Sequence, residues 1–285
     1  MYHKSSVCAA ITLYHPSSSE LERVFYYTKV FDKVFVIDNT PDDNDMSDII
    51  SHPKIQLLSR GVNLGLAKAL NLACETAFDL NFDFCCLLDQ DSEFNTDSIG
   101  IILNIISQVN IDDIAIVSPN INYEHEDGID SIRTPQLDDV DWVITSGSFV
   151  NLKIHKLLKG FDEAYFIDRL EMDYCYRAKN KGYRIVICLD SIMRQSLGEP
   201  CRAYGCNFYQ HSPLRNYYQF RNRIYYYRYK SKENIYFRFL KMGILSFKHI
   251  LKVIFIEEKK IKKICYISRA IKDSFKGAYG EYGKG

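Results

Sequence analysis

The sequence predicts an α/β protein in which helices flank a mostly parallel sheet. Short apolar runs alternate along the chain with runs of helical spacing, which is typical of β-α-β units. The runs are continuously apolar, as expected of strands that helices cover on both faces. Several runs end abruptly on acidic or polar residues. In open α/β sheets, ligands bind just beyond the carboxyl ends of the strands, so these residues are candidates for a site.

The elements of this pattern follow one another up to residue 144, and a second informative stretch begins near residue 162. We expect strands at 7–14, 33–37, 54–59, 82–88, 114–118 and 142–144, and helices at 20–31, 65–79 and 96–108. The polar segment 119–140 is long for a connection and is expected to be functional or mobile. Beyond Pro213 the pattern predicts three long helices, 214–229, 235–256 and 259–275.

Composition is that of an ordinary globular protein, with 47% hydrophobic and 25% charged residues in 285. The nine cysteines are an odd number without paired C-x-x-C motifs, which argues against a zinc site or a disulfide framework and favours a reducing cytosol. The first apolar run, 7–13, is too short for a signal peptide, and no apolar run is long enough to span a bilayer.

Two acids, Asp89 and Asp91, end the apolar run 82–88. Carboxylates one residue apart on a turn can share a hard divalent cation that keeps positions open for phosphates. Alternatively, Asp89 caps the next helix and Asp91 is a solvated loop acid. Asp38, which ends the strand 33–37, suits either a nucleoside's polar edge or a turn. Arg60 and Lys68 flank glycines before a helix start that favours an anion, although neither G-x-G-x-x-G nor a Walker A sequence is present.

Glu171 is the best candidate for a general base. It lies where the pattern becomes helical, close to Tyr165 and Phe166, and an apolar environment raises the basicity of a carboxylate. Thr145 to Ser148 combine small hydroxyl residues with a glycine and leave space for a substrate.

In order along the chain, these motifs resemble family 2 glycosyltransferases of the GT-A fold, most closely the bacterial rhamnosyltransferase-like branch. The resemblance covers most of residues 5–230. It rests on I-T-L-Y-H-P at 11–16, D-N at 38–39, N-L-G-L-A-K-A-L-N at 63–71, L-L-D-Q-D-S at 87–92, S-G-S at 146–148, F-I-D-x-x-E-x-D-x-C-x-R at 166–177 and P-L-R-x-Y-Y-x-x-R-N at 213–222.

The resemblance implies roles for individual residues, and Asp91 and Glu171 are expected to face each other across one cleft. Donor-binding residues would be Thr12, Tyr14, Asp38, Arg60, Asn63, Lys68 and Asp89; metal ligands for Mg²⁺ or Mn²⁺ would be Asp89 and Asp91; Glu171 would be the catalytic base; the acceptor side would include Ser146, Gly147, Ser148, Asp168 and Asp173. Where the family often has a histidine near the diphosphate, this chain has Gln195, a poorer transition-metal ligand, and His211 is a possible substitute.

Charge divides the chain into an acidic and a basic part. From Leu214 onward, 18 Lys and Arg against 5 Asp and Glu give +13, so the rest carries −13. We expect a GT-A catalytic domain at 1–212 and a basic, amphipathic helical region at 213–285. Its helices suit the surface of an anionic membrane, at the cytoplasmic face, or packing on the catalytic body or another subunit. No nucleic-acid module appears, and we expect no nucleic-acid partner.

The leading hypothesis is an inverting glycosyltransferase that moves L-rhamnose from dTDP-L-rhamnose to a lipid-linked glycan in O-antigen or capsule synthesis. Alternatives are transfer of a hexose from a UDP-sugar and a non-catalytic assembly subunit. A sugar nucleotidyltransferase needs a glycine-rich loop after the first strand, and this chain has no glycine before Gly61.

Overall fold

The structure is a computed structural model that describes residues 5–42, 45–108, 111–122, 136–195, 200–203 and 206–284, with 200–203 and 206–208 described by their backbone alone. The chain forms two compact units. Unit 1 is Met1–Asp162 with Tyr174–Ser196, and unit 2 is Glu163–Asp173 with Leu197–Gly285. The domain boundary expected at residue 213 stays a prediction.

Unit 1 is built on one large mixed sheet. Its strands are β1 (Val7–Leu13), β2 (Val34–Asp38), β3 (Ile55–Ser59), β4 (Phe84–Asp89), β5 (Glu93–Phe94), β6 (Ile114–Asn122), β7 (Leu137–Asp139), β8 (Phe149–Asn151) and β9 (Arg184–Arg194). The order is β3-β2-β1-β4-β8-β6-β9-β5, and β7 also pairs with β9. The first four strands are parallel, β8 runs antiparallel between β4 and β6, and β6 and β9 are parallel to each other.

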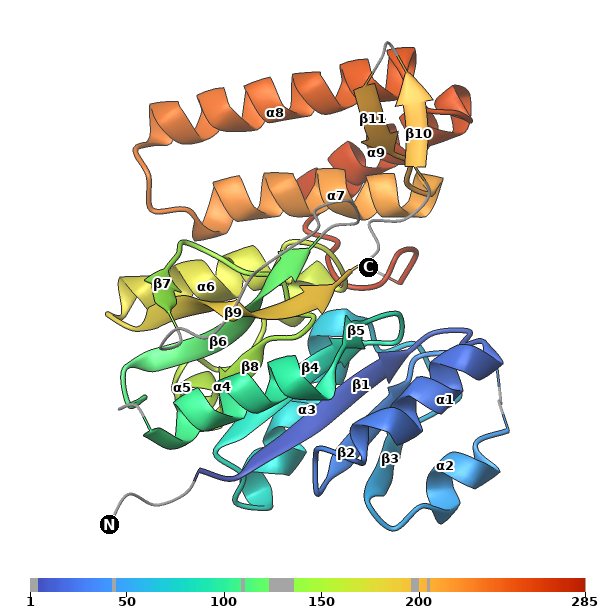
Figure 1. The fold of residues 1–285 in the computed structure, drawn as a ribbon. Helices are drawn as coiled ribbons and strands as arrows, with labels where there is room; N and C mark the ends of the chain where they lie inside the picture. Colours follow the sequence, from blue (N-terminus) through green and yellow to red (C-terminus); the bar gives the residue numbers. More distant parts are fainter. Residues whose placement is uncertain are drawn as a thin grey trace. The chain divides into compact units, whose positions relative to one another are not determined.

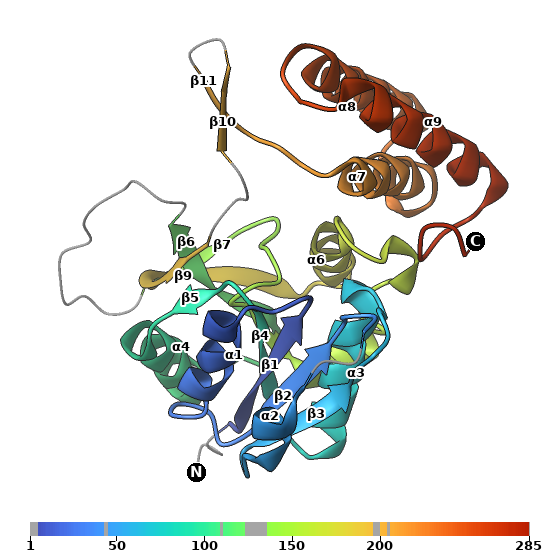
Figure 2. The same ribbon diagram turned by 90° about the vertical axis from the view of Figure 1, so that its right-hand side faces the viewer.

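Helices cover both faces of this sheet (Figures 1 and 2). They are α1 (Ser18–Tyr27), α2 (Ser47–Ser51), α3 (Leu66–Asp79), α4 (Thr96–Gln108), α5 (Leu152–Leu157) and α6 (Leu170–Asn180), whose first turn belongs to unit 2. Every second residue of β1, such as Ile11, joins a buried core with side chains of α1, α2 and α4. On the other face, α3 packs against β1, β4 and α5. The strands are therefore buried on both sides, as the continuous apolar runs predicted.

Unit 2 is mainly helical. It contains a short turn of 3₁₀ helix (Glu163–Tyr165), the hairpin β10 (Pro200–Ala203) and β11 (Cys206–Tyr209), α7 (Pro213–Tyr225), a π-helical turn (Tyr226–Lys230), α8 (Ile235–Phe255) and α9 (Lys260–Lys276). Buried side chains such as Tyr217, Phe220 and Ile267 form its core. The three predicted C-terminal helices are confirmed within a few residues. In the described chain, no helix is both long and apolar enough to cross a bilayer.

Two expectations about strands need correction. The strand predicted at 142–144 is wrong, because these residues are irregular and Trp142 is 47% exposed. The strand of this region is β8, which pairs with β4 and β6. A three-residue apolar run cannot specify a strand, whereas pairing with distant strands can. The strand predicted at 114–118 continues to Asn122, and residues 123–135 of the expected long segment lie outside the described residues.

Candidate functional site

Polar residues lie where β1, β2 and β4 end. β1 lies between the other two strands, and its register places Thr12 beside Asp89 and Leu13 beside Asp38. Because these strands are parallel, their carboxyl ends share one edge of the sheet. These three residues therefore lie at one edge of the sheet, and Tyr14 follows there. Because side chains alternate along a strand, Thr12 and Asp89 share one face of the sheet and Asp38, in register with Leu13, lies on the other.

Asp38 has a hydrogen-bond partner within the protein, whereas the hydroxyl oxygen of Thr12 has none among the described residues. Asp38 is fully buried, and its Oδ1 accepts a hydrogen bond from the Thr40 N–H at 2.9 Å. The hydroxyl oxygen of Thr12 is buried and has no hydrogen-bond partner in the described part of the chain. A buried hydroxyl without a partner is costly, so a polar ligand at this edge would relieve it.

Gln90, between the two acids, anchors their loop. Its side chain accepts a hydrogen bond from the Tyr14 N–H at 2.6 Å and donates one to Glu20 at 2.9 Å. Its carbonyl accepts a hydrogen bond from Arg23 at 2.7 Å. Glu20 also closes a capping box with Ser17 at the start of α1. The loop that carries Asp89 and Asp91 is thus fixed to the first helix.

Asp91 points toward Gln195, whose Nε2 lies 3.4 Å from Asp91 Oδ1. Although Asp91 has an exposed surface, the protein around its carboxylate removes part of the water, and this desolvation raises its pKa. The Oε1 of Gln195 is buried and has no hydrogen-bond partner among the described residues. Searched over the same residues, the structure has no group of three or more His, Cys, Asp and Glu that could bind a metal.

The start of α3 lies at the same edge of the sheet, because β3 leads into it. Gly65 precedes the helix with φ of 77°, and its N–H donates a hydrogen bond to Asn63 Oδ1 at 2.9 Å. Asn39 Oδ1 accepts the Leu64 N–H at 3.2 Å. These contacts fix the turn that the glycine permits. The binding roles of Arg60, Asn63 and Lys68 stay predictions.

Ser146, Gly147 and Ser148 run beside β4. Gly147 has φ of 78°, and a Cβ there would lie 2.6 Å from Met193 Sδ, so the close packing requires glycine. Both serines are buried; the Ser146 hydroxyl lies 2.5 Å from that of Ser92, and the Ser148 hydroxyl donates to the Ile144 carbonyl. Their hydroxyls thus bond within the protein, and an acceptor role for this segment stays a prediction.

Glu171 lies in the first turn of α6, as the pattern predicted. Its pKa is raised to about 7, chiefly by desolvation and also by the nearby charge of Asp168, although a backbone hydrogen bond and the charges of Arg169 and Arg215 oppose this effect. A carboxyl group that titrates near neutral pH suits general-base catalysis. Asp91 belongs to unit 1 and Glu171 to unit 2, so the expected shared cleft stays a prediction.

The loop before Glu171 has an unusual backbone. Phe166, Asp168 and Arg169 have φ of 62°, 65° and 69°, a region that side chains other than glycine rarely adopt. Each such residue costs about 1–3 kcal/mol, so surrounding contacts must hold the loop. Functional sites often store strain of this kind.

Residues of α7 hold this loop. Asn222 Nδ2 lies 2.6–2.9 Å from the carbonyl oxygens of Tyr165, Ile167 and Asp168. Arg221 is fully buried and donates to the carbonyl of Ala164 and to Asn222 Oδ1. A salt bridge of 3.2 Å joins Arg215 to Asp168. Asp173, five residues later in the chain, is fully buried. Among these, only the expected acceptor-side acids Asp168 and Asp173 had been assigned a role from the sequence.

Sequence reasoning therefore missed several residues that shape the site. Gln90 and Asn222 act through hydrogen bonds to segments more than 50 positions away. The sequence contained two signals: the S-x-x-E pattern at Ser17–Glu20, typical of a capping box, and the R-N pair at 221–222 within a matched motif.

The fold is of the GT-A type, and comparisons with known proteins agree with it. No family model matches the chain. Two curated relatives are similar to it in sequence. The first, dTDP-rhamnosyl transferase RfbF of Shigella flexneri, is 25% identical over 76% of this chain and 78% of its own length. Low-salt glycan biosynthesis hexosyltransferase Agl10 of Haloferax volcanii is 22% identical over 96% and 92%, respectively.

Solved structures agree in fold. GalNAc-T7, crystallised with UDP, GalNAc and Mn²⁺, matches with a TM-score of 0.57 at 11% identity over 78% of this chain, which spans 51% of that protein. S. aureus TarS 1–349 matches with a TM-score of 0.55 at 12% identity over 94% of this chain and 80% of its own. The predicted GT-A fold and the resemblance to glycosyltransferases are thus confirmed. The relatives support a glycosyltransferase of glycan biosynthesis.

Proposed function

We propose that this chain is an inverting, metal-dependent glycosyltransferase that moves L-rhamnose from dTDP-L-rhamnose to a lipid-linked glycan acceptor in bacterial O-antigen or capsule synthesis. The pairing of Thr12 with Asp89, one strand away from Asp38, at the carboxyl edge of a GT-A sheet is the observation on which the proposal depends. One relative is named as a dTDP-rhamnosyl transferase, which favours this donor.

The residues at this edge fit a divalent cation. Asp91 offers a carboxylate, and Gln195 offers a buried amide oxygen without a partner among the described residues. Mg²⁺ and Mn²⁺ prefer oxygen ligands and often keep positions open for substrate phosphates. Asp89 and Asp91, with Gln195, would hold such an ion. When bound, it would neutralise the charge on the departing diphosphate.

Each side chain then has a task in the transfer. Thr12, Tyr14 and Asp38 orient the nucleoside, while Arg60, Asn63, Lys68 and the start of α3 bind the phosphates. Glu171 accepts the proton of the acceptor hydroxyl as that oxygen attacks the anomeric carbon. The bond between the anomeric carbon and the diphosphate oxygen lies on the opposite face of the sugar. It breaks, and its electron pair leaves with the diphosphate. A single displacement of this kind inverts the anomeric configuration.

The acceptor would reach the protein from a membrane surface. Ser146, Gly147, Ser148, Asp168 and Asp173 are our candidates for its binding site. Exposed apolar side chains of α8, including Phe237 and Phe247, would lie in the headgroup region at the cytoplasmic face.

A donor panel tests the proposal. The full chain is incubated with dTDP-L-rhamnose, UDP-glucose and UDP-galactose, and nucleoside diphosphate release is measured with Mg²⁺, Mn²⁺ or EDTA. We expect release from dTDP-L-rhamnose that EDTA stops. Release from a UDP-sugar alone would favour hexosyl transfer, a candidate that UDP complexes of the neighbouring structures GalNAc-T7 and TarS support. If no donor is turned over and none raises the melting temperature, the chain is a non-catalytic subunit and the proposal fails.

A further inference from the structure

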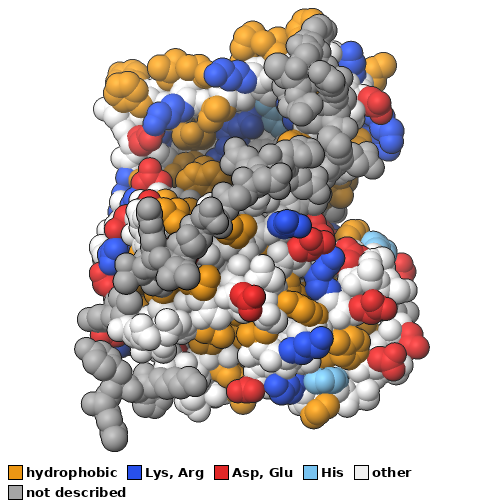
Figure 3. Space-filling model, viewed as in Figure 1, with side chains coloured by type: hydrophobic (Ala, Val, Ile, Leu, Met, Phe, Trp, Pro, Cys, Tyr) orange, Lys and Arg blue, Asp and Glu red, His pale blue; other side chains and the backbone are white. Residues whose placement is uncertain are grey.

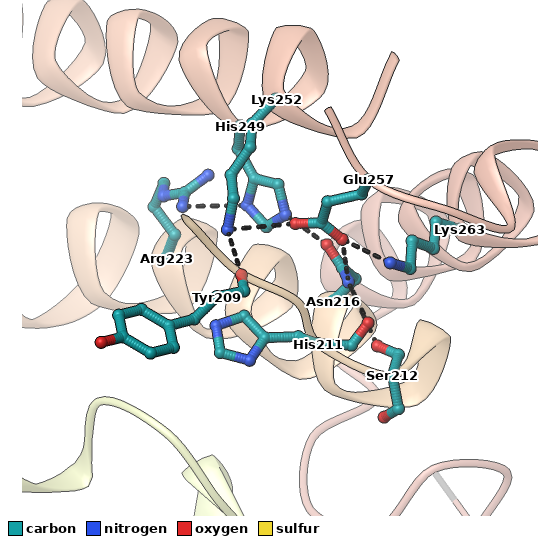
Figure 4. Close-up of polar contacts among 9 residues, drawn as sticks. All are labelled: Tyr209, His211, Ser212, Asn216, Arg223, His249, Lys252, Glu257 and Lys263. Carbon is teal, nitrogen blue, oxygen red and sulfur yellow. Dashed lines mark hydrogen bonds and ion pairs between the residues drawn. The ribbon is translucent and has the colours of Figure 1, made fainter. Parts of the chain in front are cut away.

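A group of basic side chains lies between α7 and α8 in unit 2, apart from the residues assigned to sugar transfer. Figure 4 shows Arg223 of α7 and His249 and Lys252 of α8 pointing into the space between these helices, with His211 of the preceding segment beside them. In the space-filling view, basic and histidine side chains are set back in a hollow between α7 and α8 (Figure 3). The hollow is therefore lined by cations.

Arg223 has more hydrogen-bond donors than partners. Its Nη2 lies 3.1 Å from His249 Nδ1. Its Nε and Nη1 are buried and have no hydrogen-bond partner within the described chain. Native proteins rarely leave buried donors unsatisfied, and such a group often marks the place of an ion or water. The guanidinium thus has two donors available for an acceptor of hydrogen bonds.

His249 fixes the orientation of this guanidinium. Its Nε2 lies 2.6 Å from Asn216 Oδ1, and the Asn216 amide nitrogen donates to the Ser212 carbonyl at 3.1 Å. Nε2 therefore carries the proton, and Nδ1 accepts from Arg223. Burial, and then the charge of Arg223, lower the pKa of His249 to about 4, so the imidazole is neutral near pH 7.

The carboxylate of this group is already engaged. Glu257 is buried and lies 2.6 Å from Lys263 Nζ and 3.1 Å from Lys252 Nζ. Burial raises its pKa, but hydrogen bonds from the two lysines more than offset this effect, and the pKa is lowered. Three cations, Arg223, Lys252 and Lys263, against one carboxylate leave 3 − 1 = +2 among the residues in Figure 4. Largely buried charge of one sign is costly unless an opposite charge compensates it.

We propose that Arg223, held by His249 and flanked by Lys252, binds a phosphate or diphosphate group. A guanidinium presents a planar fork of donors that matches phosphate oxygens. The same helix, α8, exposes Phe237, Leu240 and Phe247, which suit an apolar tail on that group. The phosphate can come from a lipid or from solution. The lipid source rests on the proposed function, because a lipid-linked acceptor carries such a group, whereas the site itself does not depend on it.

Binding is measured by isothermal titration of the full chain with inorganic pyrophosphate and with farnesyl diphosphate, without sugar nucleotide or divalent metal. We expect both probes to bind, and Arg223→Met to weaken binding by about tenfold or more, as for loss of a charge-assisted pair. The matched control is Lys248→Met, which removes one exposed charge from α8 and should change affinity less than about twofold by the weak effect of surface charges.

The two probes distinguish the sources. Tighter binding of farnesyl diphosphate identifies a lipid phosphate, and equal binding identifies a free phosphate; both support the site. Absence of binding by both probes overturns the proposal, as does an equal loss in the two variants. Because no donor is present, this result is independent of whether the chain transfers sugar.

A measurement on the unmodified protein covers the case in which Arg223→Met does not fold. Pyrophosphate is added while the ring nitrogen signals of His249 and His52 are followed by NMR. We expect the His249 signals to shift and those of His52, in unit 1, to stay. Unchanged His249 signals at saturating pyrophosphate would contradict the proposal.

Discussion

At the scale of single residues, burial determines how Glu171 holds its proton. A pKa of about 7 means that the carboxylate needed for transfer is lost as the pH falls below 7. We therefore expect kcat/KM to rise with pH through a limb near 7 and to level off above it. Glu171→Gln should lower the rate of sugar transfer by about 10²–10⁴-fold, the usual contribution of a general base, and leave donor affinity unchanged. Loss of donor binding in this variant would contradict the assignment of Glu171 as the base.

The same pKa predicts an effect on stability. The folded protein binds this proton more tightly than the unfolded chain does. Glu171 therefore lowers the stability of the fold as the pH rises from the ordinary pKa of a glutamate, 4.5, through 7. Relative to the wild type, Glu171→Gln should gain melting temperature between pH 5 and pH 8. Glu258→Gln, at an exposed position of the same unit, is the control and should show no such trend. Equal melting-temperature trends in the two variants would contradict the raised pKa of Glu171.

Asp91 is the residue whose removal should separate metal binding from folding. Asp91→Ala should reduce metal-stimulated turnover by about 100-fold or more, the usual cost of losing one electrostatic contact to a developing charge. The fold should tolerate the change, because Asp91 is exposed and its hydrogen bond to Gln195 is long, at 3.4 Å. Turnover and melting temperature are measured at increasing Mn²⁺, with Asp97→Ala of α4 as control. Equal Mn²⁺ dependence in wild type and Asp91→Ala would refute the assignment.

At the scale of elements, α7 should act on catalysis through the loop that precedes Glu171. Asn222→Ala removes the amide that bonds three carbonyls of a loop with three residues at positive φ. The loop should relax and displace Glu171, which can lower kcat by about 10- to 100-fold. Donor affinity should stay unchanged, and the pH limb near 7 should move, because the surroundings of Glu171 change.

A purely structural role for Asn222 makes a different prediction, which Asn151→Ala tests. Asn151 is also buried and bonds backbone groups, at the opposite end of β4 from Asp89. Both variants should lose about 1–3 kcal/mol of stability, as buried hydrogen bonds do. Only Asn222→Ala should alter kcat and the pH limb. Identical kinetics in the two variants would show that the loop contacts serve stability alone.

Local pattern sufficed for the elements whose residues depend on their neighbours. Helix 96–108 and the three C-terminal helices follow from periodicity, and Asp89 and Asp38 were placed at strand ends because apolar runs stop there. The position of β8 could not be read this way, since its pairing with β4 and β6 is non-local. Gln90 was missed for the same reason: its role depends on bonds to Tyr14 and Glu20, which only the fold brings near.

At the scale of the whole molecule, zero net charge conceals a basic C-terminal part. The +13 carried from Leu214 onward is attracted to anionic surfaces, while the −13 of the remaining chain is repelled by them. Apolar side chains stand along the surface of α8 that faces the viewer in Figure 3. Phe237, Phe247 and Phe255 of this helix have exposed fractions of 59–62%. The combination favours attachment to anionic membranes through α8 over attachment by charge alone.

Cosedimentation with vesicles tests this attachment. Phosphatidylcholine vesicles that contain phosphatidylglycerol should bind the full chain, and raising NaCl should weaken binding without abolishing it, because salt screens the charge but not the apolar contact. Phe247→Ser should lower affinity by roughly tenfold or more, since burying an aromatic side chain contributes about 1.5–3 kcal/mol. Ile50→Ser, at a 53% exposed position of α2, is the control and should have no effect. Binding that Phe247→Ser leaves intact and that salt removes completely would mean that charge alone attracts the chain. The exposed surface of α8 would then be explained better by packing against another subunit, which a concentration-dependent change in mass would reveal.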